Sequence, residues 1–297
     1  MHQARHDHEL SRRGFVAAGA AAAGAFFLGG NMSTAQEQPQ SPVITRGHIN
    51  QSVSRWCFNS LSLERLAQVA RQIGLRGIDL VNPEDFPTLK KHDLVATMVN
   101  THGIANGLNN PRYHEDCLAR IRRSIEAAAD AGFPNVITLS GNRAGMPDDE
   151  GLKNCVVALK QVVGLAEQKK VTICMELLNS KLNHKDYMCD RTEWGVELVK
   201  AVGSERFKLL YDIYHMQVQE GDVIATIRKY KDYIHHYHTA GVPGRNELDE
   251  NQELYYPAIM RAIADTGFTG YVAHEFIPRP GNDPVASLMQ AARVCDV

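Results

Sequence analysis

The feature that most constrains the fold is a regular alternation, from Gly47 onward, of short β-rich runs with longer stretches of helical periodicity. The expected strands are His48–Val53, Gly77–Val81, Leu94–Asn100, Asn135–Ser140, Val171–Leu178, Phe207–Tyr214, Ile234–Thr239 and Gly270–Phe276. The expected helices are Leu63–Ile73, Pro87–His92, Tyr113–Ala131, Asp149–Lys169, Thr192–Val202, Asp222–Tyr233, Tyr256–Asp265 and Pro284–Val294. Such βα units, repeated over about 250 residues, favour an α/β protein with a single (β/α)8 TIM barrel.

Glycines mark the ends of several expected helices. Gly74, Gly132, Gly203 and Gly267 each follow a helical stretch and precede the next β-rich run. Glycine is favoured at this place because it adopts the left-handed conformation that ends a helix without strain. No GxGxxG motif follows the first run, so the sequence gives no reason to prefer a dinucleotide-binding sheet. We therefore expect one barrel domain over residues 47–297.

The N-terminal segment has a different composition from the rest of the chain. Arg12 and Arg13 precede an uncharged Ala/Gly/Phe/Leu run over Val16–Gly30, and small residues follow at Ser33–Ala35. These features resemble a twin-arginine-type export signal. We expect a signal peptide at residues 1–35, a flexible lead-in at residues 36–46 and a periplasmic mature protein. The apolar run is shorter than the ~20 residues of a spanning helix, so stable membrane insertion is not expected after cleavage; an uncleaved anchor is the alternative.

The overall charge and cysteine content exclude several classes of protein. The 297 residues carry 32 Lys and Arg against 34 Asp and Glu, a net charge of −2, which argues against a nucleic-acid partner. Six cysteines without a CxxC motif are too few for a disulfide scaffold and do not suggest a zinc ribbon. Cys117, Cys155 and Cys174 are expected in the core. We expect a small molecule as partner, and a homo-oligomer is compatible with the sequence.

Polar residues occur near the ends of the last four expected strands. They are Glu176, Asp212, His238 and Glu275. Chemistry in a TIM barrel takes place at the C-terminal ends of the strands. A single carboxylate buried among apolar residues is costly, whereas four such groups could share one divalent cation. Three carboxylates and an imidazole suit Mn²⁺, Mg²⁺ or Co²⁺.

Other histidines and aromatic residues lie close to these positions in the sequence. Strand alternation is expected to point most of a set of three histidines to the opposite face, as core or supporting groups. These are His235, His236 and His274. Trp56, Phe58 and Tyr214 are candidates for an apolar wall beside a short substrate, with simple barrel packing as the alternative.

Several motifs, taken in order, resemble the hydroxypyruvate isomerase family, which belongs to the xylose-isomerase-like TIM barrels beside the ketose 3-epimerases. The motifs are Ser54–Phe58, Glu176–Asn179, Tyr211–Gln217, Val242–Arg245 and His274–Phe276. The resemblance runs from about Gln51 to the C-terminus. It implies that Glu176, Asp212, His238 and Glu275 are the metal ligands, and that Glu176 and Glu275 are also the acid/base pair.

The same resemblance implies which residues lie near the substrate. His215 and Arg245 match such positions in the family. In the isomerases the third metal ligand can be Gln, so His238, like Asn183–His184, is more similar to the epimerase branch. The loop at residues 246–251 departs from the glycine-containing isomerase version. The full set of residues expected to contact substrate is Trp56, His102, His184, His215 and Arg245.

The expected chemistry is proton transfer through an enediolate. A metal on the carbonyl and the adjacent hydroxyl oxygen of a hydroxy-carbonyl substrate would stabilise this species. One carboxylate would remove the carbon-bound proton, which then returns to the neighbouring carbon or to the opposite face of the same carbon. The first outcome is isomerisation, with hydroxypyruvate to tartronate semialdehyde as the best expectation. The second is epimerisation, so a ketose 3-epimerase or an isomerase of another small keto-sugar is the alternative.

Two rival functions lie outside this chemistry. A zinc-dependent endonuclease on a related barrel would need further His ligands and a basic face, which the net charge of −2 opposes. A non-catalytic exported sugar-binding barrel needs no carboxylate pair, so Glu176 and Glu275 disfavour it.

Overall fold

The computed structural model describes residues 43–297. The predicted signal peptide at residues 1–35 and most of the predicted lead-in lie outside the described residues. Residues 43–46, the end of the predicted lead-in, make hydrogen bonds to the domain. The N–H groups of Val43 and Ile44 donate to the Ile73 carbonyl. The Asp296 carboxylate accepts from the backbone N–H groups of residues 45–47.

The centre of the domain is a parallel sheet of eight strands. The strands are β1 (Asn50–Ser54), β2 (Gly77–Asp79), β3 (Val95–Ala96), β4 (Asn135–Thr138), β5 (Thr172–Leu177), β6 (Phe207–Asp212), β7 (Ile234–Thr239) and β8 (Tyr271–His274). Their order is β3-β2-β1-β8-β7-β6-β5-β4. Val99 connects the two ends, because it bridges to both Val81 and Val136. The predicted single (β/α)8 TIM barrel is confirmed.

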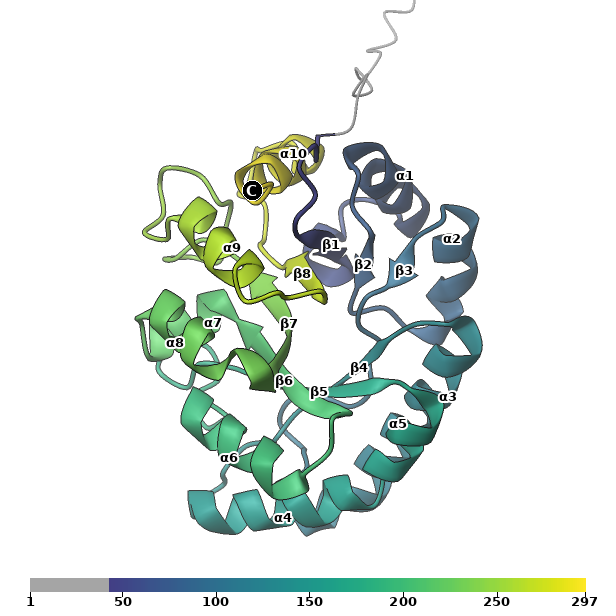
Figure 1. Cartoon of the computed structure of the whole chain (residues 1–297), viewed down its shortest axis with the longest axis vertical. Helices are drawn as coiled ribbons and strands as arrows, with labels where there is room; N and C mark the ends of the chain where they lie inside the picture. Colours follow the sequence, from purple (N-terminus) through teal and green to yellow (C-terminus); the bar gives the residue numbers. More distant parts are fainter. Residues whose placement is uncertain (1–42) are drawn as a thin grey trace, which may run out of the picture. The chain divides into compact units, whose positions relative to one another are not determined.

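Helices form a ring around the strands (Figure 1). The α-helices are α1 (Leu63–Ile73), α2 (Phe86–Lys91), α3 (His114–Ala131), α4 (Asp148–Lys160), α5 (Val163–Lys169), α6 (Thr192–Val202), α7 (Ile213–Gln219), α8 (Val223–Tyr230), α9 (Tyr256–Ala264) and α10 (Pro284–Val294). The short 3₁₀ helices are η1 (Arg55–Phe58), η2 (Pro83–Asp85), η3 (Pro111–Tyr113) and η4 (Lys231–Tyr233). None of the helices in residues 43–297 has the length and apolar character needed to cross a bilayer.

Several predicted elements have other bounds in the structure; the expected strand Leu94–Asn100, for example, is only Val95–Ala96. Two of the differences have a clear physical cause. The expected helix Asp149–Lys169 is divided into α4 and α5, because the N–H groups of Gln161 and Val162 bond to carbonyls three residues back. The expected sixth strand extended to Tyr214, but β6 ends at Asp212. The Asp212 carboxylate accepts a hydrogen bond from the His215 N–H at 3.0 Å and so caps α7. This cap turns the chain into a helix directly at the strand end.

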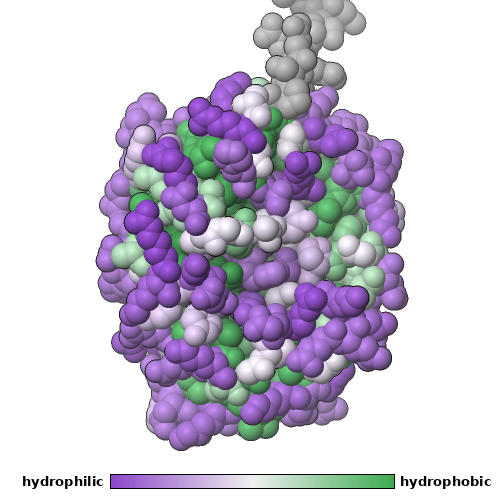
Figure 2. Space-filling view, in the orientation of Figure 1, coloured by the Kyte–Doolittle hydropathy of each residue, from purple (hydrophilic) through white to green (hydrophobic). Residues whose placement is uncertain are grey.

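Apolar residues fill both the space between sheet and helices and the inside of the barrel. A separate inner cluster consists of Met98, Ile137, Cys174 and Leu210. All six cysteines are buried and free, including the three expected in the core. Hydrophilic residues cover most of the visible outer face, with smaller hydrophobic patches between them (Figure 2). The inner cluster closes the barrel beneath the polar groups at its C-terminal end.

Candidate metal and active site

Four polar residues from consecutive strands meet inside the C-terminal end of the barrel. Glu176 lies on β5, Asp212 ends β6, His238 lies on β7 and Glu275 directly follows β8. One ligand atom from each lies within 4.8 Å of the ligand atoms of the others. All four side chains are buried. The backbone register explains the grouping, because Asp212 pairs with His238 and His238 pairs with Ala273, two residues before Glu275.

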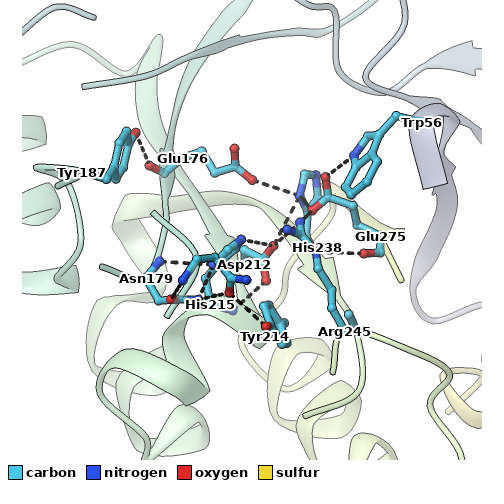
Figure 3. A network of polar contacts seen from close by, with 12 residues as sticks. Trp56, Glu176, Asn179, Tyr187, Asp212, Tyr214, His215, His238, Arg245 and Glu275 are labelled. Carbon is cyan, nitrogen blue, oxygen red and sulfur yellow. Dashed lines mark hydrogen bonds and ion pairs between the residues drawn. The ribbon is translucent and has the colours of Figure 1, made fainter. Parts of the chain in front are cut away.

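His238 lies at the centre of this group (Figure 3). Its Nδ1 atom is 2.9 Å from Glu275 Oε2, 3.3 Å from Glu176 Oε1 and 3.9 Å from Asp212 Oδ2. Arg245 Nη2 is 2.5 Å from Glu275 Oε2 and 3.4 Å from Asp212 Oδ2. Three carboxylates thus face one guanidinium and one imidazole in a buried space.

The pKa values of Glu176 and Glu275 are shifted in opposite directions. Burial raises the pKa of Glu176, and the nearby charge of Glu275 adds to this shift. Burial would also raise the pKa of Glu275, but the charges of Arg245 and His238 outweigh it and hold this pKa well below its usual range. Glu275 is therefore the glutamate whose ionised form the site favours, whereas the site favours the protonated form of Glu176 more than water does.

The residues present fit a divalent cation. His238 Nδ1 is buried and makes no well-aligned hydrogen bond, although carboxylate oxygens surround it. Burial would lower the pKa of His238, but the Glu275, Asp79 and Glu176 carboxylates outweigh it and hold this pKa well above its usual value, so a metal would displace the hydrogen on Nδ1. Together with Glu176, Asp212 and Glu275, His238 forms a donor set of oxygens and one nitrogen, which suits Mn²⁺, Mg²⁺ or Co²⁺. These four residues are the ones that would hold the cation.

Binding of a cation is expected to release protons and to weaken as the pH falls. Burial raises the pKa of Asp212 to about 7, so its carboxyl keeps a proton up to that pH. A cation needs the ionised carboxylate, and its apparent affinity should therefore rise with pH up to about 7 and then level off. Titration calorimetry with Mn²⁺ in buffers of different ionisation enthalpy measures the released protons. An affinity that does not change between about pH 6 and pH 8 would contradict this electrostatic picture.

Trp56 and Arg245 hold Glu275 in place. The Trp56 indole N–H donates to Glu275 Oε1 at 2.7 Å, while Arg245 binds the other oxygen. The guanidinium carbon of Arg245 lies 5.2 Å from the Trp56 ring centroid and 5.4 Å from that of Tyr214. The turn before Arg245 contains Gly244 at φ 97°, a left-handed conformation that glycine adopts without strain.

His215 is fully buried behind the site. The backbone N–H of Asn179 donates to His215 Nδ1 at 3.1 Å. Burial holds the pKa of His215 well below its usual value, so the ring is neutral and carries its hydrogen on Nε2. Nε2 has no hydrogen-bond partner among the described residues and lies 3.8 Å from Asp212 Oδ2. His215 thus offers a free donor beside the carboxylate cluster.

A cavity of about 300 Å³ opens onto the carboxylate cluster. Its lining residues are Trp56, Leu80, Asn100, His102, Ile104, Ile137, Leu139, Glu176, Leu178, His184, Arg245 and Glu275. Four of the five predicted substrate-contact residues line it; His215 does not and lies next to His184, with 5.3 Å between ring centroids. The apolar lining from Leu80 to Leu178 was not predicted. Its sequence signal is weak, because these residues resemble ordinary core residues at strand ends.

One further expectation about neighbouring residues needs correction, and another is met by most of its residues. Phe58 does not line the cavity but packs edge-on against Phe276 in the core, and Tyr214 lies behind Arg245. His274 does point to the outer face of the sheet, where it contacts Gln51. His236, however, points into the barrel. It is two residues from His238, and residues two apart on a strand share a face.

The fold and these residues define the protein class. A sequence model of the xylose isomerase-like TIM barrel family matches residues 62–295. The chain belongs to this family.

Among individual relatives, the chain is 24% identical to a putative hydroxypyruvate isomerase of Homo sapiens over 221 residues, which are 73% of this chain and 75% of the human protein. It is 29% identical to a 2-oxo-tetronate isomerase of Cupriavidus necator over 175 residues, which are 58% of this chain and 65% of the relative. The crystal structure of a 3-keto-D-glucoside 4-epimerase from E. coli superposes with a TM-score of 0.71 at 16% identity, and covers 83% of this chain and 100% of that one. At 16% identity, this structural similarity shows that the two proteins share a fold.

Proposed function

We propose that the protein is a metal-dependent isomerase that transfers a proton between neighbouring carbons of a small hydroxy-carbonyl compound. The preferred candidate reaction is conversion of hydroxypyruvate to tartronate semialdehyde. The observation that carries the proposal is the meeting of two buried carboxylates, Glu176 and Glu275, beside a set of metal-ligating groups at one cavity. Relatives named as hydroxypyruvate and 2-oxo-tetronate isomerases support the same class of reaction.

Each residue of the site has a defined task in this reaction. A divalent cation held by the four ligands would polarise the substrate carbonyl and lower the pKa of the adjacent carbon-bound hydrogen. One of Glu176 and Glu275 accepts that proton, and a carboxylate returns it to the neighbouring carbon. Both carboxylates contact His238 Nδ1 (Figure 3). His215 Nε2–H faces Asp212 from behind the site, and Trp56 and Arg245 keep Glu275 oriented.

The charge of the cavity restricts the substrate. Among the described residues that line it, Arg245 is the only Lys or Arg, and its Nη2 already contacts Asp212 and Glu275. Several of the other lining residues are apolar, among them Leu80, Ile137 and Leu139. A phosphoryl group would find no further cation there. The site therefore favours a neutral sugar or an acid with one carboxylate over a sugar phosphate.

A ketose 3-epimerase, or an isomerase of another small keto-sugar, is the second candidate. Two features favour it. The third ligand position is a histidine, which resembles the epimerase branch, and a cavity of about 300 Å³ leaves room beyond a three-carbon substrate. The same proton removal would serve both reactions, so only the carbon that receives the proton distinguishes them.

A substrate panel tests the proposal. Metal-loaded protein is incubated with hydroxypyruvate, tetruloses, ketohexoses, keto-sugars and a ketose phosphate, and products are followed by proton NMR. Turnover of hydroxypyruvate supports the first candidate, and turnover of a ketose at carbon 3 supports the second. Binding without turnover of any member would favour the sugar-binding rival.

We also propose that residues 1–35 direct export to the periplasm by the twin-arginine route. The paired arginines and the short apolar run support this. Changing Arg12→Lys together with Arg13→Lys should retain the precursor in the cytoplasm of a bacterial host, as measured by cell fractionation. Arg5→Lys, outside the pair, is the matched control. Normal export of the double variant would contradict the proposal, and N-terminal sequencing of the exported form would locate the cleavage site.

A further inference from the structure

Asp79 is a buried carboxylate that the proposed reaction does not use directly. It ends β2, and its side chain points into the barrel and is fully buried. Asp79 Oδ2 lies 2.8 Å from His238 Nε2, on the side of the ring away from the carboxylate cluster. Asp79 and His238 are 159 residues apart in the sequence, so closure of the barrel brings them together.

The surroundings of Asp79 fix its orientation. The Thr97 hydroxyl donates to Asp79 Oδ1 at 2.6 Å, and His236 Nε2 lies 3.1 Å from the same oxygen. The second oxygen is thereby left to His238. The Thr97 hydroxyl and His238 Nε2 donate to the two oxygens, so the carboxylate acts as an acceptor on both. Thr97 is itself 3.1 Å from Ser52 Oγ, which keeps the threonine in place.

We propose that Asp79 is a positioning residue for His238. Its carboxylate accepts the Nε2–H, and a neutral imidazole that keeps its hydrogen on Nε2 has its lone pair on Nδ1. Nδ1 is the atom that faces Glu176, Asp212 and Glu275. A carboxylate behind a ligating histidine also raises its basicity and fixes its ring. This inference rests on the proposed metal site and adds a residue that prepares it.

The neighbouring His215 shows the opposite arrangement. There the Asn179 N–H donates to Nδ1, which places the hydrogen on Nε2. Both rings therefore carry hydrogen on Nε2, but opposite ends of the two rings face the carboxylates: Nδ1 of His238 and the Nε2–H of His215. The first becomes suited to hold a cation and the second to donate a hydrogen bond.

Asp79→Asn tests the inference through metal affinity. The variant keeps the size of the side chain, but its amide can donate to His238 Nε2 and so favour a hydrogen on Nδ1. We expect Mn²⁺ affinity, measured by equilibrium dialysis of the full chain, to fall by about 10- to 100-fold. Asp190→Asn is the matched control, since Asp190 is a buried carboxylate that bonds Arg143 and Ser180. Wild-type affinity in Asp79→Asn would overturn the inference.

A second measurement does not depend on folding of the variant. In wild-type protein loaded with diamagnetic Mg²⁺, nitrogen-15 NMR of the histidine rings should show His238 with a protonated Nε2 and an unprotonated Nδ1. The reverse tautomer would overturn the inference. Failure of the proposed function gives a different result, because a wild-type protein that binds Mn²⁺ but turns over no substrate leaves the Asp79 assignment standing. If the wild-type protein binds no cation, both the proposed function and the Asp79 inference are contradicted.

Discussion

Glu176→Gln and Glu275→Gln are each expected to lower kcat by about 10²- to 10⁴-fold, because each removes a group that accepts or returns the carbon-bound proton. Gln keeps the size of the side chain and one oxygen donor, so the fold should be unchanged by circular dichroism. Turnover and metal content of each variant are measured together. Glu253→Gln, which changes an exposed carboxylate on the loop after β7, is the control and should retain wild-type turnover.

The two variants should differ in their effects on binding. Glu275 contacts His238, Arg245 and Trp56, so its replacement should also weaken metal binding and raise KM. Among the described residues, the Glu176 carboxylate makes a single close polar contact, to His238 Nδ1 at 3.3 Å. Glu176→Gln should therefore lower metal affinity less than Glu275→Gln does, and at saturating metal it should act mainly on kcat. Near-wild-type turnover in either variant would exclude that residue from proton transfer and favour the sugar-binding rival.

Removal of the metal is expected to abolish turnover completely. The protein should hold about one divalent ion per chain, because the four ligands converge on one point. Dialysis against EDTA should give inactive protein, and Mn²⁺ or Co²⁺ should restore activity. Turnover and metal content by mass spectrometry are the measurements. Full activity after exhaustive chelation would contradict a metal-dependent reaction.

Asp212 variants separate the metal contribution from a structural one. Asp212→Ala removes a ligand and also the N-terminal cap of α7, and loss of such a cap costs about 1 kcal/mol. Asp212→Asn keeps a side-chain oxygen that can cap the helix but removes the charge. We expect both variants to lose metal affinity and only the alanine variant to lose stability in thermal unfolding. Wild-type metal occupancy in Asp212→Ala would contradict its assignment as a ligand.

The barrel could be predicted because its main signal is local. Apolar runs, helical periodicity and glycine stops all lie within single elements, and eight repeats leave few alternatives. The start of α7 could not be predicted in this way, since Ile213 and Tyr214 continue an apolar run. It depends on the Asp212 cap, a contact that competes with strand extension. Closure through Val99 is equally non-local.

The residues of the candidate site differ in the same way: some have a local sequence signal, and others are placed by contacts between distant parts of the chain. Glu176, Asp212, His238 and Glu275 could be grouped from sequence because each occurs near the end of a recognisable strand. Asp79 could not, because its partner lies across the barrel and its own strand has only three residues. The inward direction of His236 follows from its spacing to His238 and was available in the sequence. The apolar lining of the cavity has no local signature.

The central claim is that this site moves a carbon-bound proton through a carboxylate that exchanges with solvent. Metal-loaded wild-type protein and its accepted substrate in D₂O, followed by NMR, test it most directly. We expect deuterium at the reacting carbon of the product, with strongly reduced incorporation after chelation and in Glu176→Gln. Rapid turnover in D₂O to a product that contains no solvent deuterium would contradict it, because the hydrogen would then have moved without residing on an exchangeable base.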